Sequence, residues 1–392
     1  MKNGAKPAAF ANMTVIDVDT HYTEPGDLWT KRAPAKWRDR VPQIKMHEGK
    51  KFWFIDDKPM NFAMSASVIG PGLKKIYDTD FFHLSVDDVD VSCNQVKPRL
   101  AAMDHMGIDI QIVYGNLLGF GGQRGFLVAP KLRLIATQLY NDAMAEMQEE
   151  SGHRMYPMAM MPWWDMKVCL AELDRCAQMG LRGINTNSDP HGHGLPDLSN
   201  SHWNPLWEAC SALDMPVNFH IGASDDSQSW FGTSPWPSFT DDRKLALGSA
   251  MMYLSNAKVV GNIIYSGILE KYPKLKFVSV ESGIGWIPFM LEALDYQLTE
   301  TAPAANDFLT MKPSEYFKRQ IYACFWFEHQ DLISMIKKVG VDNCMFETDF
   351  PHPTCLFPDP LKTAETALGT APEAFRRKVM GGNAAKLYHL NV

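Results

Sequence analysis

Short apolar runs recur along the chain, and stretches with helical spacing separate them. The runs predict strands at residues 15–21, 108–115, 155–162, 181–188, 215–222, 275–282, 320–327 and 343–350. Between them, apolar side chains repeat every three or four positions, which predicts helices over 132–147, 168–177, 203–213, 245–272, 287–298 and 332–339. Alternating strands and helices of this number predict an α/β fold, the closed parallel (β/α)8 TIM barrel. A doubly wound open sheet is the alternative, although no dinucleotide fingerprint or P-loop follows any predicted strand.

Residues 22–97, between the first two predicted strands, do not follow this alternation. They include a hairpin-like stretch at 51–59 whose turn contains Asp56 and Asp57. We therefore interpret this segment largely as a cap inserted after the first strand, within a single barrel domain that spans residues 1–392.

The first predicted strand carries an unusual set of ionisable side chains. Because side chains alternate along a strand, Asp17, Asp19 and His21 are expected on one face, opposite the apolar or hydroxyl side chains at 16, 18 and 20. Burying three such groups is costly unless they are paired or bind a metal ion. Asp19-x-His21 is therefore a candidate edge of a metal site. Taken alone, the motif is a weak signal, and a capping Asp with a surface His before a Pro turn is the favoured alternative unless other parts of the chain supply further ligands.

Other predicted strands also end in metal-ligating residue types. The fifth strand ends in His220, the sixth in Glu281 and the eighth in Asp349. In a parallel barrel the carboxyl ends of all strands meet at one mouth, so we expect these side chains to lie together. With the first strand they form a mixed nitrogen and oxygen set that suits Zn²⁺, Mn²⁺ or Fe²⁺ and leaves a position open for water.

These residues also carry a family resemblance. Asp19-x-His21, His220 and the sequence Asp349-Phe350-Pro351 resemble the amidohydrolase superfamily, in particular the amidohydrolase-related branch that includes aminocarboxymuconate semialdehyde decarboxylase. The resemblance extends from residue 15 to 390 and implies the barrel fold. It further implies that Asp349 is both a metal ligand and the proton acceptor for the metal-bound water.

Two positions depart from the pattern of this branch. Asp19 stands where His or Glu is commoner, and Glu281 stands where many decarboxylases of the branch carry a catalytic His. Glu281 is therefore a candidate acid–base group or an additional ligand. With Glu24, which closely follows His21, the candidate ligands number six, enough for a dinuclear site in which two ions share carboxylates.

Several residues outside the ligand set are candidates for contact with substrate. His352 follows Asp349 by three positions and could orient it or touch substrate, while Arg124 could bind a carboxylate through two hydrogen bonds. The remaining candidates lie in two irregular segments, 189–194 and 224–243, and are His191, His193, Trp230 and Trp236. For the histidines and for Arg124, an ordinary loop or surface role is the alternative.

Composition excludes several classes of function. The 392 residues carry a formal net charge of -7 without a basic patch, which argues against binding to nucleic acid or to an anionic membrane surface. No signal peptide or membrane span is readable, and the seven cysteines are dispersed, which together predict a soluble cytoplasmic protein with reduced thiols. We expect a small-molecule substrate and either a homo-oligomer or a hetero-oligomer with a paralogous barrel.

The residues predict a metal-dependent hydrolase of a small acyl, amide, ester or lactone-type substrate, in which Asp349 accepts a proton from metal-activated water. A metal-dependent nonoxidative decarboxylase of an aromatic or enoic acid is the first alternative. The second is a non-catalytic barrel subunit that supports an active paralogue.

Overall fold

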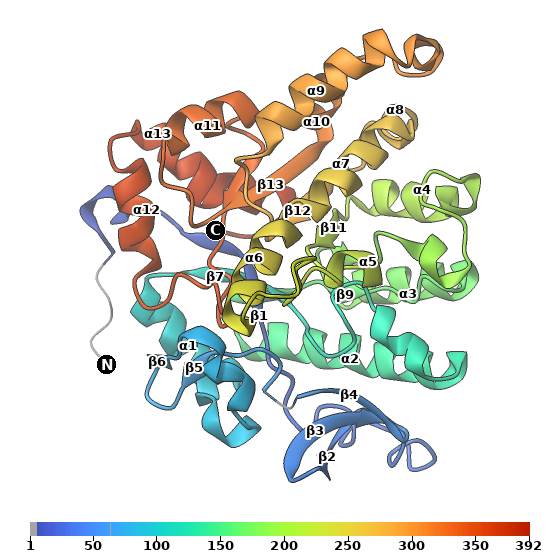
Figure 1. Ribbon diagram of the computed structural model, residues 1–392, viewed down its shortest axis with the longest axis vertical. Helices are drawn as coiled ribbons and strands as arrows, with labels where there is room; N and C mark the ends of the chain where they lie inside the picture. Colours follow the sequence, from blue (N-terminus) through green and yellow to red (C-terminus); the bar gives the residue numbers. More distant parts are fainter. Residues whose placement is uncertain (1–5, 63) are drawn as a thin grey trace.

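Short parallel strands form a ring in the computed structural model, which describes residues 6–62 and 64–392 (Figure 1). The strands of the ring are β1 (Ile16–His21), β7 (Ile110–Tyr114), β8 (Met155–Pro157), β9 (Ala159–Met160), β10 (Ile184–Asn185), β11 (Val217–His220), β12 (Phe277–Val280), β13 (Ile321–Phe325) and β14 (Cys344–Phe346). They pair in parallel as β1–β7–β8 and as β9–β10–β11–β12–β13–β14. All of them fall within the runs predicted as strands.

The two sheets join at both edges. On one side, β8 and β9 flank Met158 and occupy one strand position, since β8 pairs with β7 and β9 pairs with β10. On the other side, the amide of His21 donates to the carbonyl oxygen of Phe350 at 2.8 Å, and the amide of Asp349 donates to that of Asp19 at 2.9 Å. These contacts close the ring, so the predicted TIM-barrel-like α/β fold is confirmed.

Helices surround the strands (Figure 1). They are α1 (Val96–Met106), α2 (Pro130–Glu150), α3 (Met166–Gln178), α4 (Asn204–Leu213), α5 (Asp225–Gln228), α6 (Asp241–Met252), α7 (Ser255–Tyr265), α8 (Ile268–Lys271), α9 (Ile287–Glu300), α10 (Pro313–Gln320), α11 (Leu332–Val339), α12 (Pro360–Leu368), α13 (Glu373–Arg377) and α14 (Asn383–Leu387). The prediction of one continuous helix over 245–272 was wrong. Gly267 has a φ of 76°, a left-handed conformation that separates α7 from α8. In the described part of the chain, none of the helices has the length and apolar character to cross a membrane.

Apolar side chains pack in two layers. The inner layer combines alternate residues of the strands, such as Ile16, Val18 and Ile112, with Leu387 and Tyr388 from the C-terminal end of the chain. The outer layer packs the opposite faces of the strands against the helices. The barrel is therefore filled by side chains, and its chemistry is confined to the strand ends.

The alternation predicted for β1 is interrupted by a register shift against β7 between Asp17 and Thr20. Asp17 Oδ2 accepts a hydrogen bond from Thr348 Oγ1 at 2.6 Å, whereas Asp19 and His21 approach each other at 3.6 Å. The prediction that all three ionisable side chains of this strand share a face was therefore wrong. An extra residue in one strand re-aims the side chains that follow it.

The segment between β1 and α1 contains small antiparallel sheets. One sheet joins β2 (Gln43–His47), β3 (Lys50–Ile55) and β4 (Lys58–Phe62), and the other joins β5 (Ile69–Gly70) and β6 (Lys74–Lys75). The predicted hairpin at 51–59 is present as β3 and β4, with Asp56 at a φ of 57° in its turn. In Figure 1 the β2–β3–β4 sheet lies apart from the ring.

Candidate functional site

Four ionisable side chains from three strand ends come together at one place. Asp19, His21, His220 and Glu281 each offer a ligand atom, and these atoms all lie within 4.8 Å of one another. His220 Nε2 is 3.3 Å from Asp19 Oδ1, 3.3 Å from Glu281 Oε2 and 3.1 Å from His21 Nε2. This arrangement agrees with the expectation that the carboxyl ends of β1, β11 and β12 meet.

A second, overlapping group adds the end of β14. Asp349 and His352 join His21 and Glu281 within the same limit of 4.8 Å. Asp349 Oδ1 is 3.6 Å from His21 Nε2 and 3.2 Å from His352 Nδ1. The rings of His352 and His21 stack with centroids 3.6 Å apart. We call the six residues of the two groups the carboxylate–histidine cluster: Asp19, His21, His220, Glu281, Asp349 and His352.

Hydrogen bonds outside the cluster orient its members. His220 Nδ1 lies 2.7 Å from the carbonyl oxygen of Ile221, which can only accept, so Nδ1 carries the proton and the lone pair of Nε2 faces the carboxylates. Asp349 Oδ2 accepts from Thr354 Oγ1 at 2.6 Å, which turns Oδ1 toward the histidines. Glu281 and Asp349 have φ values of 53° and 58°. Such backbone strain is common at functional sites.

The cluster fits a divalent metal ion. Both carboxylate oxygens of Asp19 and Oδ1 of Asp349 are buried and have no hydrogen-bond partner among the described residues. Buried negative charge without compensation is strongly unfavourable. The donors are imidazole nitrogens and carboxylate oxygens, the set that Zn²⁺, Mn²⁺ and Fe²⁺ prefer. A cation bound between them would supply the missing compensation.

Burial shifts the ionisation of the cluster in the absence of a cation. It raises the pKa of the Asp19 carboxyl, and burial together with the charges of Asp349 and Asp19 raises the pKa of Glu281. Burial and the neighbouring His352 and His220 lower the pKa of His21. A neutral imidazole is the form that ligates metal. A divalent cation would reverse the shifts of the carboxyl groups, because it is the largest local charge.

Glu24, predicted as a further ligand, lies outside the cluster. Its Oε1 accepts from the backbone amides of Asn116 and Leu117 at 2.8 and 2.9 Å. Asn116 in turn contacts the cluster, because its Oδ1 lies 2.8 Å from His352 Nε2. Its side-chain amide donates to the carbonyl oxygen of Tyr22 at 3.0 Å, which fixes the orientation of the Asn116 side chain. Glu24 therefore supports the cluster through the loop after β7.

A cavity of about 230 Å³ adjoins the cluster. Glu281, Asp349 and His352 line it, as does the predicted substrate residue Arg124. Its aromatic wall comes from four segments of the chain and consists of Phe81, Phe82, Phe120, Phe231 and Tyr253. The cavity therefore combines the reactive groups with surfaces that suit a planar ring.

The two tryptophans predicted as pocket wall do not line this cavity. Trp230 and Trp236 are 36% and 65% exposed, and Trp236 packs against Phe239. From the same segment, it is Phe231 that reaches the cavity. The segment is irregular, so aromatic content alone could not show which of its rings turns inward.

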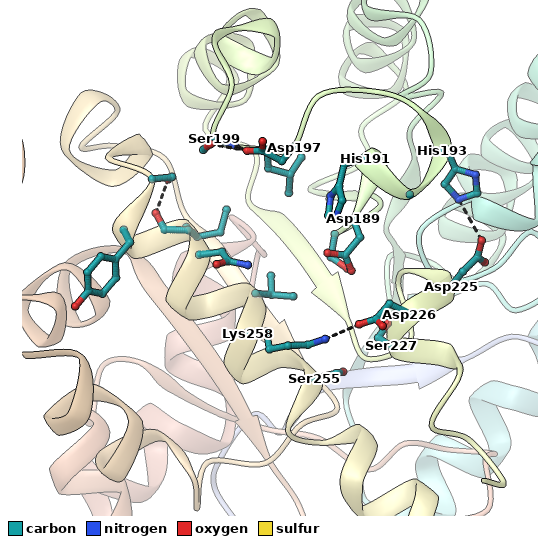
Figure 2. Close-up of a pocket in the computed structure, with 18 residues that line it drawn as sticks. Asp189, His191, His193, Asp197, Ser199, Asp225, Asp226, Ser227, Ser255 and Lys258 are labelled. Carbon is teal, nitrogen blue, oxygen red and sulfur yellow. Dashed lines mark hydrogen bonds and ion pairs between the residues drawn. The ribbon is translucent and has the colours of Figure 1, made fainter. Parts of the chain in front are cut away.

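His191 and His193 line a different and larger cavity of about 720 Å³ (Figure 2). None of its lining residues lines the smaller cavity. Figure 2 shows two pairs among its charged groups: His193 Nε2 lies 3.3 Å from Asp225 Oδ2, and Lys258 forms an ion pair with Asp226. The structure therefore does not bring the two histidines to the carboxylate–histidine cluster.

Three residues near the site were not among the predicted site residues. Asn116 lies two positions after the last residue of β7, so its place near a strand end was a usable signal. Glu347 lies two positions before Asp349, is fully buried, and its Oε2 accepts from the amide of Glu281 at 3.3 Å. Tyr253 lies between α6 and α7, where no periodic pattern marks a site residue.

Comparisons with known proteins identify the family. The amidohydrolase family model matches residues 16–390. A gamma-resorcylate decarboxylase from Polaromonas sp. (strain JS666 / ATCC BAA-500) is 27% identical over 314 residues, which cover 75% of this chain and 87% of that protein. An amidohydrolase from Mycobacterium avium subsp. paratuberculosis K-10 has a similar structure, with a TM-score of 0.75 and 22% identity over 96% of this chain and 99% of that chain.

A third similar protein was solved with a metal ion. The structure of a dihydroxybenzoic acid decarboxylase from Polaromonas sp. JS666 contains manganese and the inhibitor 2-nitroresorcinol. It has a TM-score of 0.64 and 20% identity, over 97% of this chain and 98% of that chain. With the family match and the cluster described above, these findings identify the chain as a metal-dependent enzyme of the amidohydrolase family.

Proposed function

We propose that this enzyme catalyses the nonoxidative decarboxylation of a small aromatic acid that carries a hydroxyl group beside its carboxylate. The observation that carries the proposal is the position of the carboxylate–histidine cluster beside a small cavity with aromatic walls. The decarboxylases among its relatives support it. They favour the decarboxylase alternative over the hydrolase that the sequence was expected to encode.

We assign the binding of the metal ion to Asp19, His21, His220 and Asp349, with Glu281 as a further candidate ligand. A divalent ion held by them would act as a Lewis acid. It would neutralise the negative charge of the substrate carboxylate and of the hydroxyl oxygen beside it on the aromatic ring. Zn, Mn and Fe ions all suit these ligands. The contacts of His220 and Asp349 support this assignment, since His220 Nε2 lies 3.1 Å and Asp349 Oδ1 lies 3.6 Å from the same atom, Nε2 of His21.

Decarboxylation replaces the carboxylate of the ring with a proton. The ring carbon takes up the proton, the bond from this carbon to the carboxylate breaks, its electron pair returns to the ring, and carbon dioxide leaves. We assign proton donation to Glu281, because its carboxyl group lines the cavity and lies beside Asp349. His352, held by Asn116, lies beside the same pair and is positioned to orient Asp349.

The segment 22–97 completes the proposed active site. Met64, Ser65, Phe81 and Phe82 from this segment line the same cavity as the strand-end residues Glu281 and Asp349, which supports its role as a cap within a single-domain enzyme. A cap that excludes water favours transfer of one proton to the ring carbon over competing reactions. An oligomeric state and a cytoplasmic location remain predictions from the sequence.

The proposal is tested with purified protein loaded with Mn²⁺ and, separately, with Zn²⁺. The loaded protein is incubated in D2O with 2,6-dihydroxybenzoate and with other 2-hydroxybenzoates, and products are followed by NMR and by release of carbon dioxide. We expect one carbon dioxide per ring consumed and deuterium at the vacated ring carbon. Chelated protein serves as the control. Hydrolysis of an ester, amide or lactone panel without decarboxylation of any aromatic acid would overturn the proposal.

A further inference from the structure

The larger cavity of about 720 Å³ carries an excess of negative charge (Figure 2). Among the described residues, its lining includes four aspartates, one lysine and two histidines, so carboxylates outnumber cationic groups even when both histidines are protonated. We propose that this cavity is a second ligand site, which binds a small linear diamine through its ammonium groups. The inference goes beyond the proposed function and does not rest on it, because no described residue lines both cavities.

Two of the four aspartates, Asp189 and Asp197, have no cationic partner. Within residues 6–62 and 64–392, neither forms an ion pair, whereas the other two aspartates belong to the pairs described above. Asp189 is half-buried, and its Oδ2 accepts from the hydroxyl group of Ser188 at 3.2 Å. Hydrogen bonds from Ser199 lower the pKa of Asp197, which keeps this carboxylate charged at neutral pH. Both carboxylates can therefore accept N–H bonds from an ammonium group.

A buried hydroxyl group without a partner lines the same cavity. Ser255 is 3% exposed, and its Oγ has no hydrogen-bond partner among the described residues. Figure 2 shows Ser255 on the cavity wall together with Asp189. Buried polar groups in native structures are nearly always paired, so an unpaired one on a cavity wall indicates a bound polar group. A hydroxyl oxygen can accept a hydrogen bond from an ammonium group.

The spacing of the carboxylates argues against a metal ion as the occupant. In the carboxylate–histidine cluster, ligand atoms from four residues lie within 4.8 Å of one another. In the described part of the chain, no three Asp, Glu, His or Cys side chains of the larger cavity converge in this way. The volume of the cavity lies within the range of about 300 to 1,000 Å³ that is typical of pockets for small organic molecules. Separated carboxylates in a large cavity suit an extended cation that carries a charge at each end.

The test measures binding to the full-length, metal-loaded protein by isothermal titration calorimetry. The probes are 1,4-diaminobutane and 1,6-diaminohexane, with butane-1,4-diol as the matched neutral compound. We expect at least one diamine to bind about 10-fold or more tightly than the diol, because hydrogen bonds between ammonium and carboxylate groups are stronger than neutral ones. Added sodium chloride should weaken this binding, since the charges at the cavity rim are exposed to solvent. Equal binding of the diamines and the diol, or no binding of either, would overturn the inference.

Two variants locate the diamine in this cavity. Asp189→Asn keeps the shape of the side chain but removes its charge, so we expect binding to weaken by about 10- to 100-fold. Ser255→Ala removes only the unpaired hydroxyl group, so binding should weaken by about 3- to 10-fold. Asp214→Asn, at an exposed carboxylate paired with His389, is the matched control and should bind as the parent does. Unchanged binding in both cavity variants would place the diamine elsewhere and overturn the inference.

Thermal unfolding separates these effects from a loss of structure. Ser255→Ala should be at least as stable as the parent, because it no longer buries an unpaired polar group. If Asp189→Asn unfolds at a lower temperature than the parent, the weaker binding in Ser255→Ala alone decides the test.

A comparison with chelated protein excludes the carboxylate–histidine cluster as the binding site. Because the two cavities are separate, diamine affinity should agree within about 2-fold between metal-loaded and chelated protein. Binding that requires the active-site metal would overturn the inference, and so would displacement of the diamine by an equal concentration of Ca²⁺. Failure of the decarboxylation test would overturn the proposed function and leave this diamine site standing.

Discussion

Nδ1 of His352 lies 3.2 Å from Oδ1 of Asp349, in a contact that requires a proton or a cation. Asn116 donates its side-chain amide to a backbone carbonyl oxygen, so its Oδ1 must accept from His352 Nε2 at 2.8 Å. A neutral His352 would then direct a lone pair from Nδ1 toward the carboxylate oxygen of Asp349. The loop after β7 thus determines how this histidine faces the end of β14.

Replacing His352 by Phe tests this relationship. His352→Phe keeps the ring that stacks on His21 but removes both nitrogens. We expect metal content to be retained and kcat to fall by about 10- to 100-fold, because the group that orients Asp349 is lost. Elemental analysis and steady-state kinetics provide the readouts. His389→Phe, from an exposed pair with Asp214, is the control. Unchanged kcat in His352→Phe would exclude a role in positioning.

Loss of a proposed ligand should lower metal affinity. In His21→Ala and in Asp349→Asn, we expect the affinity for Mn²⁺ or Zn²⁺ to fall by more than about 100-fold, since changes outside the ligand set already cost 10- to 100-fold. Competition with a fluorescent chelator measures the affinity. The matched controls His389→Ala and Asp214→Asn should bind metal as the parent does. Parental affinity in both ligand variants would contradict the metal site.

Glu281→Gln distinguishes a proton donor from a ligand of a second ion. If Glu281 donates the proton, the variant keeps its shape and its metal content, and turnover falls by about two orders of magnitude. If Glu281 ligates a second ion, the metal content falls from about two ions per chain toward one. We expect the first result. Mass spectrometry counts the metal ions per chain, and steady-state kinetics measures turnover; together they distinguish the two roles. A variant with the metal content and the activity of the parent would show that Glu281 is neither the proton donor nor a ligand of a second ion.

Arg99 should contribute to stability through the backbone of the site. Its guanidinium group is buried and donates to the carbonyl oxygens of His21, Ser92 and Cys93 and to Gln111 Oε1. Arg99→Met leaves these acceptors unpaired, so we expect a loss of about 3 kcal/mol in the free energy of unfolding.

Urea unfolding, monitored by circular dichroism, measures this loss. The exposed Arg377→Met should change the free energy of unfolding by less than about 0.5 kcal/mol. If Arg99→Met were as stable as Arg377→Met, the buried hydrogen bonds of Arg99 would not hold β1 in place.

Sequence periodicity was sufficient to predict where the strands of the barrel lie and which residues stand at their ends. Strand and helix patterns are local, and parallel strands deliver their carboxyl ends to one mouth, so His21, His220, Glu281 and Asp349 could be grouped without coordinates. Arg124, which follows the second predicted strand, lines the cavity beside these residues, and its contact with substrate stays a prediction.

Only the tertiary structure decided which other side chains belong to the site. The register shift in β1 turns Asp17 toward Thr348, and the amides of the loop after β7 hold Glu24 outside the cluster. Phe231 enters the cavity in place of Trp230. These outcomes depend on the pairing of distant strands and on the course of irregular loops. Neither leaves a periodic signal, because both are set by contacts between residues far apart in the sequence.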